Sequence, residues 1–343
     1  MAMMKPVLEA LIAARSANRK VVFTSLVETR GSTPQKAGAA MLVFEDGTQV
    51  GTLGGGCVEA EVKRKSLENL ATGETEIVQF QLNHDYGWDD GLICGGRMTM
   101  LISPVESTEA GAYYERYLQS VESAKGCIEA VIVDEKVGVP GSRYLFSSGS
   151  EFISPEGTPA PPQVLIENVP VIENRPRATL KDGISYLPYL PQARLLIIGA
   201  GHVGRALAKY AADVDFAVTV VDDREVFCNQ ENIPEANDCI VGNFEDVLPG
   251  LEVDQQTLCV IVTRGHNHDE EALFHLIQKQ PRFLGMIGSK RKIRLIFDDL
   301  LRNGIDEALL EKVHAPIGLE IGSQTVPEIA ISIVAQLIES RNR

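Results

Sequence analysis

The sequence is short of the features that mark membrane proteins and nucleic-acid-binding proteins. None of its apolar runs approaches the roughly 20 residues that a membrane span requires. Its 32 Lys and Arg residues are outnumbered by 47 Asp and Glu residues, and the resulting net charge of -15 would repel a phosphate backbone. We therefore expect a cytoplasmic protein that binds neither membranes nor nucleic acids and holds any anionic ligand by local devices.

Cysteine is also scarce and scattered. The six cysteines form no C-x-x-C pair and none of the short spacings of a zinc ribbon or a disulfide scaffold, so reduced thiols are expected. Cys127 and Cys259 lie in apolar, strand-like runs and are expected in the core. Cys57 and Cys94 differ, because each adjoins glycines, in GGGCVE and ICGGRM.

The first half of the chain predicts a mixed α+β domain over residues 1–147. Helical and strand-like periods alternate there, with a hairpin signal at Asp46-Gly47 and a helix closed by Gly73. The order helix, strand, turn and strand over residues 4–50 recurs in outline over residues 108–147.

The remainder divides into a Pro-rich stretch and a second domain. Residues 148–190 contain SPEGTPAPP and ENVPVIENRP, which predict an irregular inter-domain connection. Residues 191–343 alternate short buried runs with amphipathic helices, which is typical of a doubly wound, Rossmann-like α/β domain.

The clearest motif is GAGHVG at residues 199–204, which fits G-x-G-x-x-G between a strand and a helix. In such a turn Gly199 allows the tight bend, Gly201 lets a pyrophosphate approach and Gly204 permits close packing of helix on strand. Asp222 and Asp223 follow about twenty residues later, where an acidic residue accepts bonds from ribose hydroxyls. The pattern favours a dinucleotide or pterin-dinucleotide site, and His202, at a position that is usually small, would crowd or adapt it. The alternative is a Rossmann-like turn that binds nothing.

Two further strand ends fall on the same edge of the predicted sheet. In TRGHNHDEEAL, Asp269 is expected to cap the following helix, and His266 and His268 form an H-x-H pair for which no third metal ligand is identified. In GMIGSKRK, Ser289 is a good N-cap. The cations that follow Ser289 indicate either a bound anion or a solvated basic turn.

The predicted helix that begins near Cys57 places this thiol at a positive dipole end beside exposed glycine N–H groups. That setting would favour the thiolate, which could ligate a soft metal or attack an electrophile. Cys94 could line the same pocket. The alternative is that both glycine runs are tight turns.

Six segments together resemble one known family. They are ETRGSTPQKAGAAMLVFEDGTQVGTLGGGCVEAEV, LICGGRMTMLISPV, LLIIGAGHVGRALAKYAADVDFAVTVVDDR, VIVTRGHNHDEEAL, FLGMIGSKRK and HAPIGLEIGSQTVPEIAISIVAQL. In this order, over about residues 15–338, they resemble the xanthine dehydrogenase accessory protein family, also called the XdhC/CoxI family.

The resemblance implies a molybdenum cofactor chaperone with an accessory domain and a Rossmann domain. Such a protein binds and protects the mature or sulfurated cofactor and delivers it to a molybdenum hydroxylase such as xanthine dehydrogenase. Cys57 and Cys94 stand at the family's GGGC.E and CGG segments, so contact between these thiols and molybdenum is a hypothesis. A homodimer is expected by analogy. Whether the Rossmann site holds part of this cofactor or NAD(P) stays open.

Two enzyme functions remain as alternatives. An NAD(P)-dependent oxidoreductase would need a proton-transfer residue, but His202 lies inside the phosphate turn, and His266 and His268 fit a loop equally well. A thiol enzyme built on Cys57 would lack an adjacent resolving cysteine. We expect a chaperone and assign no catalytic residue. The predicted cofactor-binding residues are Gly55, Gly56, Cys57, Cys94, Gly199, Gly201, His202, Gly204, Asp222, Asp223, Gly288, Ser289 and Lys290.

Overall fold

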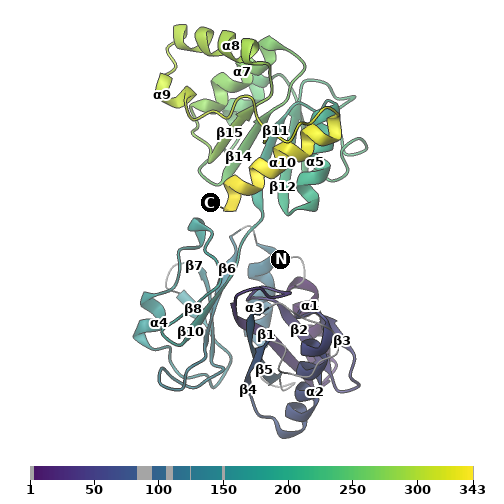
Figure 1. Ribbon diagram of the computed structural model, residues 1–343, viewed down its shortest axis with the longest axis vertical. Helices are drawn as coiled ribbons and strands as arrows, with labels where there is room; N and C mark the ends of the chain where they lie inside the picture. The colour runs from purple at the N-terminus through teal and green to yellow at the C-terminus, as the bar shows by residue number, and fades with distance from the viewer. Residues whose placement is uncertain (1–3, 83–94, 106–110, 124, 149–150, 343) are drawn as a thin grey trace. The chain divides into compact units, whose positions relative to one another are not determined.

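The computed structural model describes residues 4–82, 95–105, 111–123, 125–148 and 151–342. The chain divides into two compact units, Met1–Pro191 and Gln192–Arg343 (Figure 1). No described helix is long and apolar enough to cross a bilayer.

The first unit begins with a five-stranded antiparallel sheet in the order β3-β2-β1-β5-β4. Its elements are α1 (Met4–Ser16), β1 (Val21–Arg30), β2 (Ala40–Phe44), β3 (Gln49–Gly51), α2 (Gly56–Thr72), β4 (Glu76–Gln81) and β5 (Arg97–Val105). The predicted hairpin at Asp46-Gly47 is confirmed, because β2 pairs with β3 around it. Gly73 is confirmed as the C-cap of α2, with a left-handed φ of 74°.

A second antiparallel sheet repeats this strand order as β8-β7-β6-β10-β9. It is built from α3 (Gly111–Glu122), β6 (Cys127–Ile132), β7 (Arg143–Ser148), β8 (Glu151–Ile153), α4 (Gln163–Glu167), the 3-10 turn η2 (Ile172–Asn174), β9 (Thr179–Lys181) and β10 (Ile184–Tyr189). The outline recurrence seen in the sequence is present in the described residues, because α1, β1 and β2 are followed in the second sheet by α3, β6 and β7 in the same order. The recurrence extends to the last two strands of each sheet.

The Pro-rich stretch 148–190 is more ordered than its sequence predicts. It contributes β8, α4, β9 and β10, and β10 lies inside the second sheet between β6 and β9. Pro188 is tolerated in β10 because β9 pairs only with residues 184–186, so Pro188 has a neighbouring strand on one side only.

The two sheets of the first unit meet through their central strands. Val27, Leu101, Val131 and Leu187 form one buried cluster, and they come from β1, β5, β6 and β10. The buried Ser185 hydroxyl of β10 donates to the Val27 carbonyl of β1. The sheets therefore share a small core of their own.

The second unit has a parallel sheet in the order β13-β12-β11-β14-β15, as the sequence predicted for a Rossmann-like domain. Its strands are β11 (Ala193–Ile198), β12 (Phe216–Asp222), β13 (Asp238–Val241), β14 (Thr257–Ile261) and β15 (Phe283–Met286). Its helices are α5 (His202–Asp213), α6 (Phe244–Val247), η3 (Leu248–Gly250), α7 (His266–Ile277), α8 (Lys290–Arg302), α9 (Glu307–Leu310) and α10 (Val326–Asn342).

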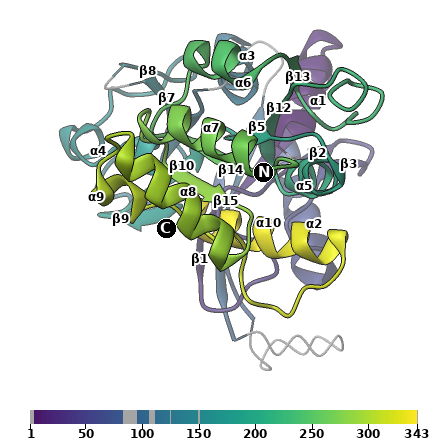
Figure 2. The ribbon, with the colours of Figure 1, turned by 90° about the horizontal axis from the view of Figure 1, so that it is seen from above.

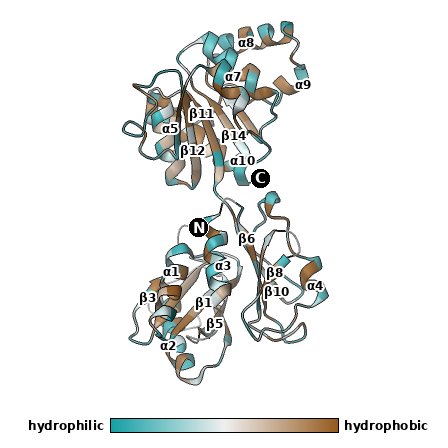
Figure 3. Ribbon diagram, turned by 180° about the vertical axis from the view of Figure 1, so that it is seen from behind, coloured by the Kyte–Doolittle hydropathy of each residue, from teal (hydrophilic) through white to brown (hydrophobic). Residues whose placement is uncertain are grey.

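Alternate residues of these strands pack into two separate cores. Leu195 and Ile197 face α5 and α10, whereas Leu196 and Ile198 face α7 and α8. Helices α5 and α10 lie side by side (Figures 1 and 2), and the strands between the helices are coloured mainly as hydrophobic in Figure 3. Both faces of the sheet are thus covered, which leaves the carboxyl edge as the place where loops present side chains.

Candidate functional site

The glycine turn after β11 has the steric requirements of a phosphate-binding turn. Gly199 has a φ of 113°, and a Cβ there would lie 2.6 Å from the Val262 carbonyl oxygen. A Cβ on Gly204 would collide with the Gly199 carbonyl oxygen, whereas a Cβ on Gly201 would meet no heavy atom of the described residues within 4 Å. The space beside Gly201 is open, and His202, the first residue of α5, is exposed.

The carboxylate of Asp222 at the end of β12 is bound by the chain itself. Ala200 N–H donates to its Oδ2 at 2.7 Å, and Arg224 Nη2 donates to the same oxygen at 2.9 Å. Its Oδ1 accepts from Arg224 N at 3.0 Å and from Arg224 Nε at 2.8 Å. Burial alone would raise the pKa of Asp222, but the bonds from Arg224 and Ala200 outweigh it and lower this pKa below its ordinary value.

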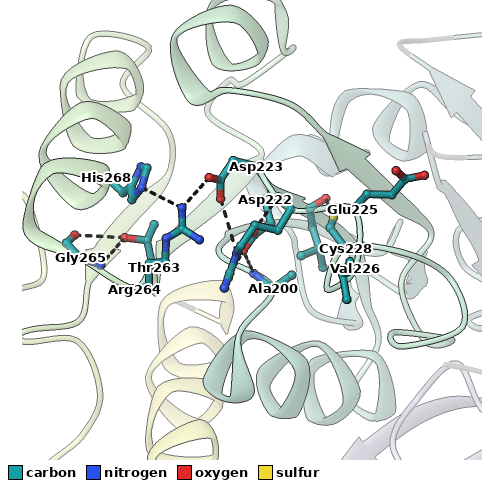
Figure 4. Close-up of polar contacts among 12 residues, drawn as sticks. Ala200, Asp222, Asp223, Glu225, Val226, Cys228, Thr263, Arg264, Gly265 and His268 are labelled. Carbon is teal, nitrogen blue, oxygen red and sulfur yellow. Dashed lines mark hydrogen bonds and ion pairs between the residues drawn. The ribbon is translucent and has the colours of Figure 1, made fainter.

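A second ion pair spans the end of β11. Arg264 follows β14, and its Nη2 donates to Asp223 Oδ2 beyond the end of β12 at 2.7 Å. Since β11 lies between β12 and β14 in the sheet, this pair crosses the point where the strand order reverses. Figure 4 shows Arg264 between Asp223 and His268, whose Nε2 lies 3.4 Å from Arg264 Nη2.

The expectation that Asp269 caps α7 is wrong. The N-cap is Gly265, and Asp269 is the fourth helical residue, with a fully buried side chain. The Thr263 hydroxyl and the Lys292 ammonium both donate to its carboxylate. Burial raises the pKa of Asp269 in spite of these two partners. Asp269 therefore ties the loop after β14 to the first turn of α8.

The turn that begins α8 has the predicted cap. Ser289 Oγ accepts from Lys292 N at 3.3 Å, which confirms Ser289 as the N-cap. Ser289 and Lys290 are exposed, and Gly288 is half-buried just after β15. Because β14 lies between β11 and β15, this turn is two strands away from the glycine turn.

In the part of the chain that the structure describes, His266 and His268 do not belong to the same group of possible metal ligands. His266 groups instead with Glu270 and Asp299, and their ligand atoms lie within 4.8 Å of one another. All three side chains are between a quarter and two fifths exposed, and Asp299 is already paired with Arg302 Nη1 at 2.6 Å. This group is explained as a charged surface cluster.

In the first unit, Cys57 is the second residue of α2 and is half-buried. Gly55, the N-cap of α2, has a φ of 74°, and Gly56, the first helical residue, has a φ of 68°. The consecutive glycines therefore provide a left-handed backbone that delivers the thiol to the first helical turn.

Glu59, in the first turn of α2, holds the glycine segment before this helix by hydrogen bonds to its backbone. Its carboxylate accepts from the backbone N–H groups of Leu53 at 2.8 Å and Gly55 at 3.0 Å, and from the side chains of Thr52 and Gln49. Burial opposes these bonds, but together they lower the pKa of Glu59. The segment around Cys57 is thus held by an anionic side chain despite its glycines.

The segment RGSTP, residues 30–34, lies between the two glycine-rich stretches. A Cβ on Gly54 would lie 2.9 Å from Pro34 Cβ, and Ser32 forms a parallel bridge with Gly95. Cys94, the second predicted thiol ligand, lies outside the described residues.

A cavity of about 600 Å³ lies in the first unit, lined by residues of both sheets. On its polar wall, Glu28 accepts from Arg30 Nε at 2.6 Å and from Arg97 Nη2 and Thr99 Oγ1, both at 3.1 Å. Such convergent polar groups can orient a ligand. No sequence pattern indicated this cluster, because Glu28 and Arg97 are far apart along the chain.

Glu59 and Arg224 were also missed. Both carried a local signal, since Glu59 follows a glycine N-cap at the spacing of an acidic residue in a first helical turn, and Arg224 lies two residues after Asp222. The sequence could not indicate that the Glu59 side chain bonds to the glycine segment before α2, or that the Arg224 side chain bonds to Asp222.

Two family models match the chain. One, described as the XdhC and CoxI family, matches residues 14–81, and the other, described as the XdhC Rossmann domain, matches residues 195–337. A probable xanthine dehydrogenase subunit of Bacillus subtilis is 26% identical over 326 residues, covering 94% of this chain and 94% of the relative. The molybdenum cofactor insertion chaperone PaoD of Escherichia coli is 22% identical over 340 residues, covering 98% of this chain and 88% of PaoD. A crystal structure described as a xanthine dehydrogenase from Bacillus halodurans is 27% identical, with a TM-score of 0.79 over 98% of this chain and 96% of that one.

Proposed function

The chain belongs to the XdhC and CoxI family, and from this premise we propose that it binds molybdenum cofactor and delivers it to a molybdenum hydroxylase such as a xanthine dehydrogenase. The observation that carries the proposal is the segment around Cys57. It places a half-buried thiol in the first turn of α2, and it lies within the region that the family model matches. The full-length likeness to a molybdenum cofactor insertion chaperone supports the same role.

The local chemistry suits molybdenum as cargo. A thiolate is a soft ligand, and a helix N-terminus stabilises it through its positive dipole end. The Glu59 carboxylate accepts hydrogen bonds from the backbone N–H groups of Leu53 and Gly55. Cys57 therefore follows a segment that is held in place by hydrogen bonds. We propose that Cys57 contacts the cofactor and that Cys94, which precedes Gly95 in the sequence, assists it.

The second unit has a candidate anion site of its own. The open space beside Gly201 and the N–H groups at the start of α5 suit a phosphate group, which pterin cofactors carry. We propose that this turn binds a phosphate group of that kind. Release of the cofactor from Cys57 to the client hydroxylase then requires only the exchange of the thiolate ligand, with no reaction on the pterin.

Cofactor retention tests this proposal. The purified protein is mixed with freshly released molybdenum cofactor and passed through a desalting column, and molybdenum and pterin are measured in the protein fraction. We expect about one equivalent of each with the native chain and a large loss with Cys57→Ala. Cys239→Ala is the matched control, because Cys239 is a half-buried thiol on β13 of the other unit.

A second measurement follows delivery. An apo-hydroxylase is activated by the loaded chaperone, and the rate of activation is compared between the native protein and Cys57→Ala. Retention below about one tenth of an equivalent by the native chain would refute cofactor binding. Full retention and delivery by a Cys57→Ala/Cys94→Ala variant would instead refute the thiol site.

A further inference from the structure

The end of β12 carries a carboxylate that has no acceptor capacity left for a ligand. Asp222 is 2% exposed and receives four hydrogen bonds, one from Ala200 and three from Arg224. An ionised carboxylate offers about four acceptor sites on its two oxygens. All of them are used within the chain.

This position has a known task in Rossmann domains that bind dinucleotides. The acidic residue at the end of the second strand accepts hydrogen bonds from the ribose hydroxyls, close to the glycine turn. Asp222 occupies that position, but the Arg224 guanidinium takes the place of the hydroxyls, with Nε and Nη2 at 2.8 and 2.9 Å from the two carboxylate oxygens.

We propose that Arg224 is the specificity-determining residue of this turn, and that it closes the site to nucleotides of the NAD(H) type by occupying their ribose acceptor. The proposal concerns nucleotides alone and does not depend on whether the protein carries molybdenum cofactor.

Several contacts keep Arg224 in this place. Its guanidinium lies 4.2 Å from the centre of the Phe227 ring, and its Nε is 3.6 Å from Asp223 Oδ1. Its two side-chain bonds to Asp222 form a bidentate, charge-assisted pair with only 27% of the arginine side chain exposed. A ribose would have to displace this pair, and its neutral hydroxyls offer weaker bonds in return.

The anion end of the same turn stays open. Among the described residues, nothing lies within 4 Å of the Cβ direction of Gly201, and the first turn of α5 contains no acidic residue. The site therefore admits a phosphate group, but the Asp222 carboxylate that would accept hydrogen bonds from the next sugar of NAD is already occupied by Arg224. The phosphate position is therefore open while the ribose acceptor is occupied, unlike in a former dinucleotide site that can bind neither group.

Binding of ADP-ribose tests the proposal directly. Isothermal titration calorimetry is performed with ADP-ribose on the full-length native chain, on Arg224→Met and on Arg194→Met. Methionine keeps an apolar side chain against Phe227 while freeing Asp222. Arg194 is the matched control, because its partner is Asp254 and it lies at the opposite end of the sheet, near the start of β11. We expect Arg224→Met to bind ADP-ribose about tenfold more tightly than the native chain or more, which is the effect of one hydrogen bond to a charged group.

Two further variants make the outcome decisive. Adding Asp222→Asn to Arg224→Met should abolish the gain, because the carboxylate acceptor is then gone. If Arg224→Met folds poorly, Arg224→Gln replaces it in the test. For this variant, binding is measured as the rise in melting temperature when ADP-ribose is added. Equal affinity of the native chain and both Arg224 variants would overturn the proposal, and so would a gain of the same size in Arg194→Met.

Discussion

The guanidinium of Arg143 on β7 lies 2.8 Å from the carboxylate of Glu129 on β6, and both side chains are almost completely buried. Arg143 Nη2 also donates to Ser25 Oγ on β1 at 2.9 Å, and the Tyr113 hydroxyl on α3 donates to Glu129 at 2.7 Å. An ion pair of the second sheet thus reaches the first sheet. The two sheets are joined by charge as well as by their shared apolar cluster.

Removing one partner of this pair should destabilise the first unit strongly. Arg143→Met leaves Glu129 as an uncompensated buried charge, so we expect the free energy of unfolding to fall by about 3–5 kcal/mol. Replacing both partners, as in Arg143→Met/Glu129→Leu, should recover most of the loss. Urea denaturation, monitored by circular dichroism, measures the free energy of unfolding of the single and the double variant. A double variant as unstable as the single one would contradict the expectation.

The carboxylate of Glu59 should make stability depend on pH in the acid range. Its pKa is lowered from an ordinary 4.5 in the folded state, so its contribution is complete above that value and is lost as the pH falls through the folded-state pKa. Glu59→Gln should therefore be less stable than the native chain at pH 7 by about 1 kcal/mol, because it weakens part-buried hydrogen bonds to a charged acceptor. The difference should narrow below pH 4.5, whereas a constant difference from pH 7 to pH 3 would show that Glu59 does not act through its charge.

Two glycines of the turn after β11 should respond differently to a side chain. Gly201→Val adds atoms to open space at a φ of -69°, so the protein should fold with nearly unchanged stability and lose binding of a phosphate ligand. Gly204→Ala drives a methyl group into the Gly199 carbonyl oxygen and should lower the melting temperature by several degrees. Thermal unfolding and titration with pyrophosphate separate the two effects. Unchanged pyrophosphate binding by Gly201→Val would mean that the open space is not the anion site.

The pairing of Lys292 with Asp269 should become more important as the pH rises. Burial already raises the pKa of Asp269, so this carboxyl stabilises the fold most at pH values below its unfolded pKa and loses that contribution as it ionises. Lys292→Met removes the cation that offsets ionisation, so its destabilisation should be larger at pH 8 than at pH 5.

Two comparisons test this explanation of Lys292. Asp269→Asn combined with Lys292→Met should remove the pH dependence between pH 5 and pH 8. Lys290→Met changes an exposed lysine in the same helical turn and should leave stability within about 0.5 kcal/mol of the native value at both pH values. Destabilisation by Lys292→Met that does not vary with pH would indicate lost packing rather than lost charge.

The sequence predicted those parts of the fold that depend on neighbouring residues. The strand, glycine turn and helix from Ala193 to Asp213 and the hairpin at Asp46-Gly47 are specified by local periodicity and turn chemistry, and both are present. The order of the stretch 148–190 was not predicted, because its prolines lie in loops or, in the case of Pro188, at the end of β10 that β9 does not pair.

The candidate site was only partly accessible to sequence reasoning. Spacing could place Asp222 at the end of a strand, but it could not indicate that Arg224, two residues later, turns back and occupies it. Sequence spacing also could not predict the contact between Glu28 of β1 and Arg97 of β5, because this contact depends on the register of the two strands in the sheet. Positions are therefore predictable from local pattern, whereas the partners of a side chain are decided by tertiary packing.

The matching strand orders of the two sheets give the first unit an internal pseudo-symmetry. Strands β1 and β5 of the first sheet correspond in order to β6 and β10 of the second, and these same four strands supply Val27, Leu101, Val131 and Leu187 to the shared cluster. An interface in which equivalent surfaces meet is the hallmark of a twofold homodimer. The first unit thus has the architecture of a tethered dimer of half-size protomers. The glycine-cysteine segment lies at the α2 position of one half, whereas the corresponding position of the other half, α4, lies in Pro-rich sequence.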